Sequence, residues 1–193
     1  MLPFGATLLE GDEAMTTSAL NREVLEVLIS MEELPYLGEP VSQLEHSLQC
    51  GKQLQATGND SLVLAGVLHD VGRARGIQVR GEAHEVTGQH WVGERFGERM
   101  GWLVGQHVPA KKVLVAIDEH YASILSSTSI ASLRVQGGQA TAAEVAVFME
   151  DPNAGDALAL RRADDHAKKP GGEAMTLGEV ADLVQRVEGE SAV

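Results

Sequence analysis

Apolar residues recur at three- and four-residue steps along most of the chain, which is the spacing of one face of a helix. Glycine and proline mark the ends of several of these segments, and two Thr-x-x-Glu sequences match the capping box that starts a helix. The pattern predicts helices at 19–33, 40–57, 60–70, 82–96, 98–106, 109–123 and 156–168, with Pro40, Asp60 and Pro109 at helix starts, and two more after Thr141 and Thr176. A loop at 74–81 and an irregular Ser-rich stretch at 126–139 are predicted between them.

The stretch 62–68 consists only of Leu, Val, Ala and Gly. A helix that is apolar all round is typical of a protein interior, so this segment predicts a buried central helix. It ends at the dipeptide His69-Asp70, shortly before Gly72. A buried helix is therefore predicted to present two potential ligand side chains at its end.

No useful length of sequence alternates apolar and polar residues as a strand does, and no internal repeat or interdomain linker is evident. A chain of 193 residues suits one domain. Few aromatic residues and many Gly and Ala residues favour closely packed helices. We expect an all-α, single-domain helical bundle at 19–188, preceded by a flexible segment 1–18 and followed by a tail 189–193.

The formal net charge is −13, and Lys and Arg form no sustained run. The attraction of basic surface to phosphate backbones that drives nucleic-acid binding is therefore missing, and we expect no nucleic-acid partner. An anionic substrate would have to be drawn by a local cluster of positive groups, or by metal ions, against the overall field.

Cys50 is the single cysteine, which excludes an intrachain disulfide framework and fits a reducing compartment. Residues 1–18 lack the cationic start and long apolar run of a secretory signal, and no stretch approaches the ~20 apolar residues of a membrane span. We expect a cytoplasmic protein with no membrane partner. The oligomeric state stays open.

Histidine and aspartate residues are dispersed through the chain in an order that can build a two-metal pocket. Imidazole nitrogen and carboxylate oxygen together suit iron, zinc or manganese. Asp70, at the end of the buried helix, is the natural candidate to bridge two ions, and six ligands for two ions leave coordination positions open for catalysis. The candidate ligands are His46, His69, Asp70, His84, His107 and Asp164.

Each of these residues also has a structural explanation when it is taken alone. A lone helical histidine is more often a surface or hydrogen-bonded residue than a ligand, and we assign that role to His90, His120 and His166. Asp164 lies near Arg161 and Arg162 and could belong to a solvated ion-pair face, to which we assign Asp165. The ordered set as a whole favours metal binding.

The order His, His-Asp, Asp resembles the HD-domain superfamily, whose pattern matches His46, His69, Asp70 and Asp164. Most HD proteins are phosphohydrolases, but the flanking runs resemble the mixed-valent diiron HD oxygenases that cleave carbon–phosphorus bonds. These runs are YLGEPVSQLEHS from Tyr36, HVPAK from His107, QGG from Gln136 and RRAD from Arg161, and the resemblance spans roughly 33–187.

The resemblance implies an Fe(II)/Fe(III) pair with dioxygen as co-substrate. One iron would be held by His46, His69, Asp70 and Asp164, and Asp70 would bridge to a second iron held also by His84 and His107. Tyr36 and Glu39 resemble the lid pair of the family. Positions that contact the phosphonate are matched by Lys111, Ser129, Gln136 and Arg161, and Arg73 stands where a family member has a histidine near the phosphonate.

The substrate implied by the resemblance is 1-hydroxy-2-(trimethylammonio)ethylphosphonate, cleaved to glycine betaine and phosphate; the alternative is 2-amino-1-hydroxyethylphosphonate, which yields glycine and phosphate. Two other classes of function use the same ligands. One is a dinuclear HD phosphohydrolase that needs no oxygen, against which Tyr36 and Glu39 argue. The other is a non-catalytic metal-binding or oxygen-sensing domain, against which the complete set of phosphonate contacts argues.

Overall fold

The computed structural model describes residues 18–36 and 38–191, and helices build its architecture. Within these ranges there is no β-strand, only an isolated bridge between Pro35 and Ser42. The all-α prediction is therefore confirmed. In chain order the helices are α1 (Ala19–Ser30), α2 (Gln43–Leu54), η1 (Gln55–Thr57), α3 (Asp60–Leu68), η2 (Val71–Arg73), α4 (His84–Phe96), α5 (Glu98–Ile117), α6 (Tyr121–Ile124), α7 (Ser127–Val135), α8 (Ala142–Glu150), α9 (Ala154–His166) and α10 (Leu177–Ser191).

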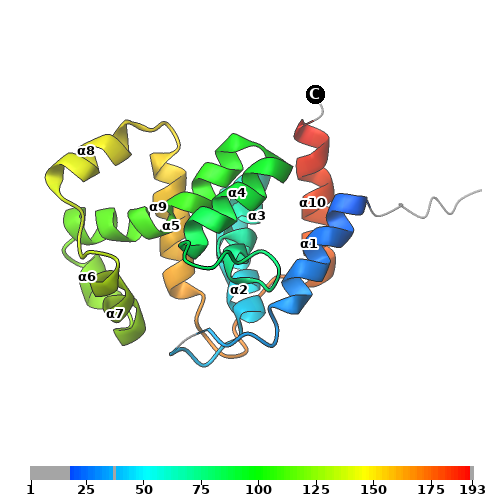
Figure 1. Ribbon diagram of the computed structural model, residues 1–193, viewed down its shortest axis with the longest axis horizontal. Helices are drawn as coiled ribbons and strands as arrows, with labels where there is room; N and C mark the ends of the chain where they lie inside the picture. Colours follow the sequence, from blue (N-terminus) through cyan, green and yellow to red (C-terminus); the bar gives the residue numbers. More distant parts are fainter. Residues whose placement is uncertain (1–17, 37, 192–193) are drawn as a thin grey trace, which may run out of the picture.

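Helix α3 is the centre of the bundle, as its sequence predicts. Every residue from Leu62 to Leu68 is buried, because α2, α5, α9 and α10 pack around it (Figure 1). Helices α1 and α10 lie side by side at one end of the molecule, whereas α6, α7 and α8 form the other end (Figure 1). The end of α3 therefore delivers His69 and Asp70 to the interior of the bundle.

Helices α4 and α5 pack unusually closely because glycine lies at their contact. A Cβ atom added to Gly101 would lie 2.7 Å from the carbonyl oxygen of Gln89 and 2.8 Å from the Cα of Gly93. Any larger residue would push the two helices apart. This close approach brings the histidines that α4 and α5 carry toward each other.

Helix α5 continues through Pro109, so the predicted break between 98–106 and 109–123 is wrong. An interior proline removes one backbone hydrogen bond and usually kinks or ends a helix, but here the surrounding packing overrides that cost. His107 and Lys111 consequently lie one turn apart on the same face of one rigid helix.

Other predicted boundaries differ from the structure by a few residues. Helix α2 begins at Gln43 with Ser42 as its cap, rather than at Pro40. Asn59, not Asp60, caps α3. In both helices the cap side chain accepts a hydrogen bond from the backbone of the first turn. Several neighbouring residues can make this contact, so the sequence alone does not show which one does.

The predicted irregular stretch at 126–139 contains the helix α7, so that prediction is wrong. The Ser126 side chain accepts a hydrogen bond from the backbone nitrogen of Ser129 and starts the helix, although the segment has little apolar periodicity. Both predicted capping boxes, at Thr141 and Thr176, are confirmed by reciprocal contacts with Glu144 and Glu179.

The chain ends fall partly outside the described residues. Of the predicted flexible segment 1–18, only Ser18 is described, and it caps α1. Helix α10 extends to Ser191, so the part of the predicted tail that is described continues this helix. In the part of the chain with described coordinates, none of the helices has the length and apolarity needed to cross a bilayer.

Candidate metal centre and anion pocket

The first group of candidate ligands combines His46 from α2, His69 at the end of α3 and Asp164 from α9. The Nε2 atoms of the two histidines are 3.0 Å apart, and His46 Nε2 lies 3.4 Å from Asp164 Oδ1. All three side chains are buried. Their ligand atoms lie within 4.8 Å of one another, so they can hold one metal ion.

The second group combines Asp70 with His84 from α4 and His107 from α5. Asp70 Oδ1 lies 3.0 Å from His84 Nε2 and 3.7 Å from His107 Nε2, and the two histidine Nε2 atoms are 3.0 Å apart. This group also meets the geometric requirement for an ion. The two groups are adjacent, because Asp70 Oδ2 faces His69 Nε2 of the first group at 3.7 Å.

The outer nitrogen of each histidine has an acceptor that orients the ring. Nδ1 of His46, His69 and His107 meets the backbone carbonyl of Ala167, Gly66 and Val104 at 2.7, 2.8 and 2.6 Å, and Nδ1 of His84 lies 3.0 Å from a Glu85 carboxylate oxygen. With the proton on Nδ1, each Nε2 presents a lone pair to its neighbour at 3.0 Å. Two Nε2 lone pairs cannot hydrogen-bond to each other, but a cation placed between them can bind both. The residues of both groups therefore fit a metal ion.

The electrostatics of His46, His107 and Asp70 favour the forms that bind metals. Burial lowers the pKa of His46 to about 4 and that of His107 to about 3, so both imidazoles are neutral at pH 7. For Asp70, burial is outweighed by the charge of Arg73 and by interactions with His69 and His84, and its pKa lies well below the ordinary value. Neutral imidazole and ionised carboxylate are the states that coordinate a metal.

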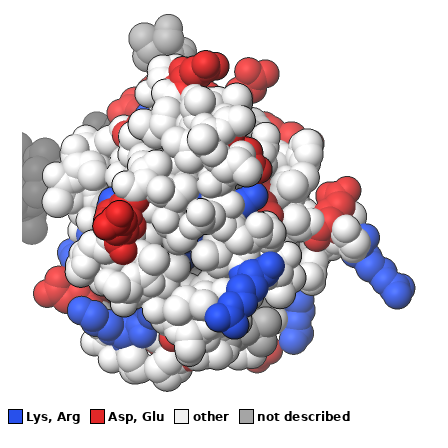
Figure 2. All heavy atoms as spheres, turned by 90° about the vertical axis from the view of Figure 1, so that its left-hand side faces the viewer, with Lys and Arg blue, Asp and Glu red and all other residues white. Residues whose placement is uncertain are grey.

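A cavity of about 190 Å³ opens beside both groups, and residues from α2, α5, α7 and α9 line it. The predicted phosphonate contacts that reach its wall are Arg73, Lys111, Ser129, Gln136 and Arg161. On the outer surface at the α6–α8 end, by contrast, Lys and Arg residues stand apart from one another, with Asp and Glu residues on the same face (Figure 2). Cationic side chains from η2, α5 and α9 thus meet at one cavity of an acidic protein.

Lys111 and Arg161 are the buried cations of this cavity. Lys111 Nζ donates to Ser132 Oγ at 2.8 Å, and burial together with repulsion from Arg161 lowers the pKa of Lys111 to about 8. Arg161 Nη1 lies 2.6 Å from Asp164 Oδ2. Although burial opposes its charge, Asp164 and Asp165 raise the pKa of Arg161 well above the ordinary value, so it stays positive at any physiological pH.

Arg73 extends from η2 over the second group of ligands. Its Nε donates to Asp70 Oδ1 at 3.0 Å, and its Nη2 lies 3.0 Å from His84 Nε2. Arg73 stands where a member of the resembling family has a histidine. It is thus in contact with two candidate metal ligands and also lines the cavity.

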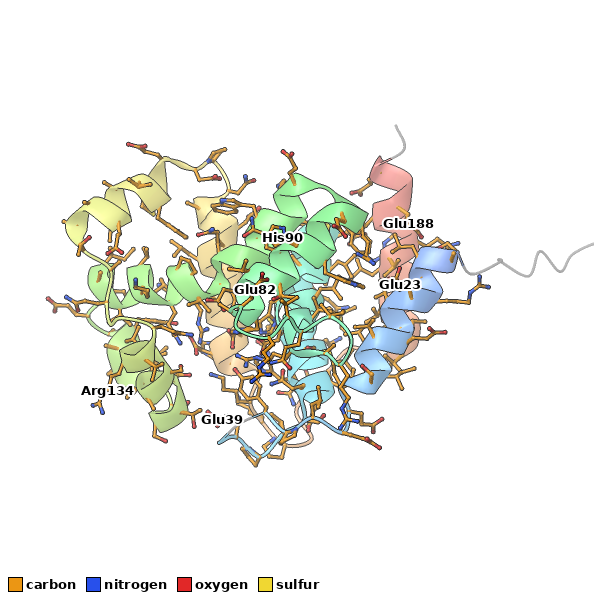
Figure 3. All side chains as sticks on the ribbon, in the orientation of Figure 1. Glu23, Glu39, Glu82, His90, Arg134 and Glu188 are labelled. Atoms are coloured by element: carbon orange, nitrogen blue, oxygen red, sulfur yellow. The ribbon has the colours of Figure 1, made fainter. Side chains whose placement is uncertain are left out.

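The predicted lid residues occupy different places. Tyr36 lines the cavity, stacks on the ring of His46 with centroids 4.0 Å apart and brings its hydroxyl to 3.4 Å from Asp164 Oδ1. Burial and the charge of Asp164 raise the pKa of Tyr36 well above its ordinary value. Glu39 lies further along the same loop, at the lower edge of Figure 3, and accepts a hydrogen bond from Ser126 Oγ at 2.6 Å.

Sequence reasoning missed Gln43, a buried residue of the cavity wall. Among the described side chains, Oε1 of Gln43 and Oε1 of Gln136 are buried without a hydrogen-bond partner. Both therefore offer an acceptor to a bound molecule. The sequence did hold one signal for Gln43. It precedes His46 by three residues and so lies on the same face of the helix.

Four residues were assigned no role in the site. His90 on α4 (Figure 3), His120 and His166 are exposed, as expected. The assignment of Asp165 to a solvated face is wrong, because its side chain is only 4 % exposed and pairs with Arg161 and Lys168. Residues from α6 and α7 cover it, and their positions could not be inferred from the spacing on α9.

Gly72 sets the distance between Asp70 and His84. A Cβ atom at this position would lie 2.0 Å from the His84 carbonyl oxygen and 2.8 Å from the Gly88 nitrogen. We expect Gly72→Ala to displace the start of α4, lower the free energy of unfolding by about 1–3 kcal/mol and weaken binding of one of the two metal ions. Thermal melts and titration of the protein with Fe(II) measure both effects.

The matched control is Gly155→Ala in α9, where an added Cβ meets open space. That change is expected to be neutral or to stabilise the helix by up to about 1 kcal/mol. A Gly72→Ala protein that melts and binds two ions as the wild type does would contradict the role of Gly72.

No protein-family model matches the chain. It is 32 % identical over 160 residues to the glycine-betaine-forming 1-hydroxy-2-(trimethylamino)ethylphosphonate dioxygenase of Leisingera caerulea, an alignment that covers 79 % of this chain and 82 % of that protein. It is 34 % identical over 146 residues to the hydroxymethylphosphonate dioxygenase of Gimesia maris, covering 70 % of this chain and 72 % of the relative. The chain therefore belongs to the family of hydroxyphosphonate dioxygenases, and it is an oxygenase.

Proposed function

We propose that this protein is a diiron, dioxygen-dependent enzyme that cleaves the C–P bond of a 1-hydroxyphosphonate and releases phosphate. The observation that carries the proposal is that residues of the two ligand groups line a small cavity together with the buried cations Lys111 and Arg161. The names of the two relatives, both phosphonate dioxygenases, agree with it.

Each of the two proposed irons has its own set of donors. His46, His69, Asp164 and one oxygen of Asp70 would hold the first iron, and the other oxygen of Asp70, His84 and His107 would hold the second. Mixed nitrogen and oxygen donors suit iron. When bound, a mixed-valent Fe(II)/Fe(III) pair supplies the redox chemistry and the activation of dioxygen.

The side chains of the cavity would bind and orient the substrate. Lys111 and Arg161 can pair with the phosphonate oxygens, because ionised donors make the stronger hydrogen bonds to such anions. Ser129 and the Gln136 side chain add neutral contacts on the same wall. Tyr36 would cover the first ligand group and move aside when substrate enters.

The proposal also extends to the group that the substrate carries on the carbon next to its hydroxylated carbon. The ring of Tyr36 offers a π-face to the trimethylammonio group that the sequence favours. Arg73 places a positive charge in the same cavity, which disfavours any cationic substituent, amino or trimethylammonio. Hydroxymethylphosphonate, which has no such substituent and is in the name of one relative, joins the candidates for this reason.

The test loads the protein with iron and supplies each of the three 1-hydroxyphosphonates with oxygen. Cleavage converts the hydroxylated carbon to a carboxyl group, so one O2 should be consumed for each phosphate and each glycine betaine, glycine or formate released. The relative kcat/KM values then identify the substrate. Phosphate release without oxygen, from a phosphoester and with redox-inert metals, would instead establish the phosphohydrolase.

A pH dependence follows from the pKa of Lys111 at about 8. Below that value the ammonium is charged and attracts the phosphonate, and above it the charge is lost, so KM should be nearly constant up to pH 8 and rise by about tenfold at higher pH. Steady-state assays from pH 6 to 9.5 measure this change.

Lys111→Ala should raise KM at neutral pH. In this variant KM should rise much less above pH 8 than in the wild type, and kcat should change less than KM. Lys112→Ala removes the neighbouring lysine, which pairs with Glu144 away from the ligand groups, and serves as control. An unchanged KM in Lys111→Ala would refute the phosphonate contact.

A further inference from the structure

The side chain of Asp165 is a buried carboxylate surrounded by hydrogen-bond donors. Arg161 Nε lies 3.0 Å from Asp165 Oδ2, and Lys168 Nζ lies 3.0 Å from Oδ1. Arg161 Nη2 and the hydroxyl of Tyr121 donate to the same carboxylate. These partners come from α9, the segment after it and α6, and α6 and α7 lie beside the lower end of α9 (Figure 1).

The contacts of Asp165 determine the orientation of Arg161. The carboxylate takes Nε and Nη2 along one edge of the planar guanidinium, while Nη1 reaches Asp164 Oδ2 at 2.6 Å. A guanidinium held along one edge cannot rotate, so its remaining N–H groups have defined directions. Because Arg161 lines the cavity, those directions decide where an anion can bind.

Asp165 also controls Ser129 through Lys168. Lys168 Nζ donates to Ser129 Oγ at 2.9 Å, whereas the contact of Ser129 Oγ with Asp165 Oδ1 is long, 3.5 Å. The serine thus receives a strong hydrogen bond, and its own proton remains available to a ligand in the cavity. The Lys168 ammonium also lies 5.8 Å from the ring centroid of Tyr36, which joins this cluster to the predicted lid.

We propose that Asp165 is a positioning residue, which holds Arg161, Lys168 and Ser129 in the arrangement that receives the phosphonate. The inference rests on the proposed function, since it concerns how that site binds its substrate. It also assigns Lys168 to the anion side of the site.

The charges of the cluster agree with an anionic ligand. Lys111, Arg161 and Lys168 bring three positive charges to this part of the site. Asp165 pairs with Arg161 and Lys168, and Asp164 pairs with Arg161. The cluster therefore keeps a net positive charge for an anionic head group. Without the carboxylate the cations would repel one another and separate, which would lose the preorganised arrangement.

The test is Asp165→Asn, which preserves shape and removes the charge. The probe is methylphosphonate, which has the anionic head group but no hydroxyl to oxidise, titrated calorimetrically into iron-loaded protein without oxygen. We expect its Kd to weaken on the order of tenfold. Iron content should stay near the wild-type value, the melting temperature should fall because a buried ion pair loses one partner, and KM for the turned-over substrate should rise more than kcat falls.

The matched control is Asp156→Asn, the same change on the same helix at a largely exposed pair with Arg99. It should leave the methylphosphonate Kd unchanged. If Asp165→Asn does not fold, Tyr121→Phe removes one donor to Asp165 at constant volume and should weaken methylphosphonate binding to a smaller extent.

The outcomes separate this inference from the proposed function. Wild-type protein that binds methylphosphonate tightly, with variants at Asp165 or Tyr121 that bind it equally well, would overturn the positioning role. Variants that lose iron and stability but keep the Kd of the folded fraction would show a structural role only and overturn it also. Wild-type protein that does not bind methylphosphonate would count against the proposed function itself.

Discussion

Replacing Asp70 by Ala is expected to abolish the paired metal site. Its two carboxylate oxygens face different ligand groups, Oδ2 toward His69 at 3.7 Å and Oδ1 toward His84 at 3.0 Å. Alanine removes both donors, so bound iron should fall from two ions per chain to one or fewer and the magnetic signal of a mixed-valent pair should disappear. Loss of a side chain that only hydrogen-bonds to a metal ligand lowers activity by up to about 100-fold. Loss of the ligand itself should lower turnover by more than that.

Asp70→Asn tests the bridge more finely, because an amide offers one oxygen and no charge. One of the two ligand groups should then keep its donor from residue 70 while the other loses it, giving a singly loaded protein. Asp156→Ala, at an exposed ion pair, is the control for loss of a carboxylate. An intact mixed-valent signal in Asp70→Ala would refute the assignment of Asp70 as the bridge.

Replacing Arg161 by Ala is expected to reduce both stability and substrate binding. Its guanidinium is buried between Asp164 and Asp165, so alanine leaves two buried carboxylates without their main partner. Removing one partner of a buried pair typically costs about 3–5 kcal/mol. We expect a lower free energy of unfolding of that size in denaturant melts, and at least a tenfold rise in KM for the phosphonate.

Arg162→Ala is the matched control for this change. The adjacent arginine is largely exposed and pairs with Asp118, and exposed pairs contribute about 0–1 kcal/mol. Arg161→Lys keeps the charge but not the planar edge, so it should restore stability more than it restores KM. Wild-type KM in a folded Arg161→Ala protein would remove Arg161 from the substrate site.

The amount of the site that was predictable differs from residue to residue. His69 and Asp70 could be found because a wholly apolar helix ends at them, a feature that local composition reveals. Gln43 shares the helix face of His46, yet nothing local indicates that this face meets a cavity. The family resemblance singled out Asp164 as a ligand, but only the packed structure shows that its neighbour Asp165 is buried and paired.

The errors in the predicted elements have related causes. Pro109 was expected to begin a helix because its ring disrupts a helix interior, but α5 is stabilised by its packing against α4 and α9 and continues through it. Helix α7 has little apolar periodicity, and it buries only Ser129 and Leu133. Tertiary contacts outweighed local preference at Pro109, whereas α7 starts from the Ser126 cap, which the apolar pattern does not reveal.

Local periodicity and composition were enough to predict the all-α class, the buried central helix and the types of side chain available for metal and anion binding, and the family resemblance implied how the ligands group. The distances within the two ligand groups, the backbone contacts that orient their rings and the burial of Asp165 beside Arg161 came from the packed structure. Such facts depend on contacts between distant segments, as between Asp165 and Tyr121, which are 44 positions apart. Spacing along one helix determines which face a residue occupies, but the elements packed against that face determine its role.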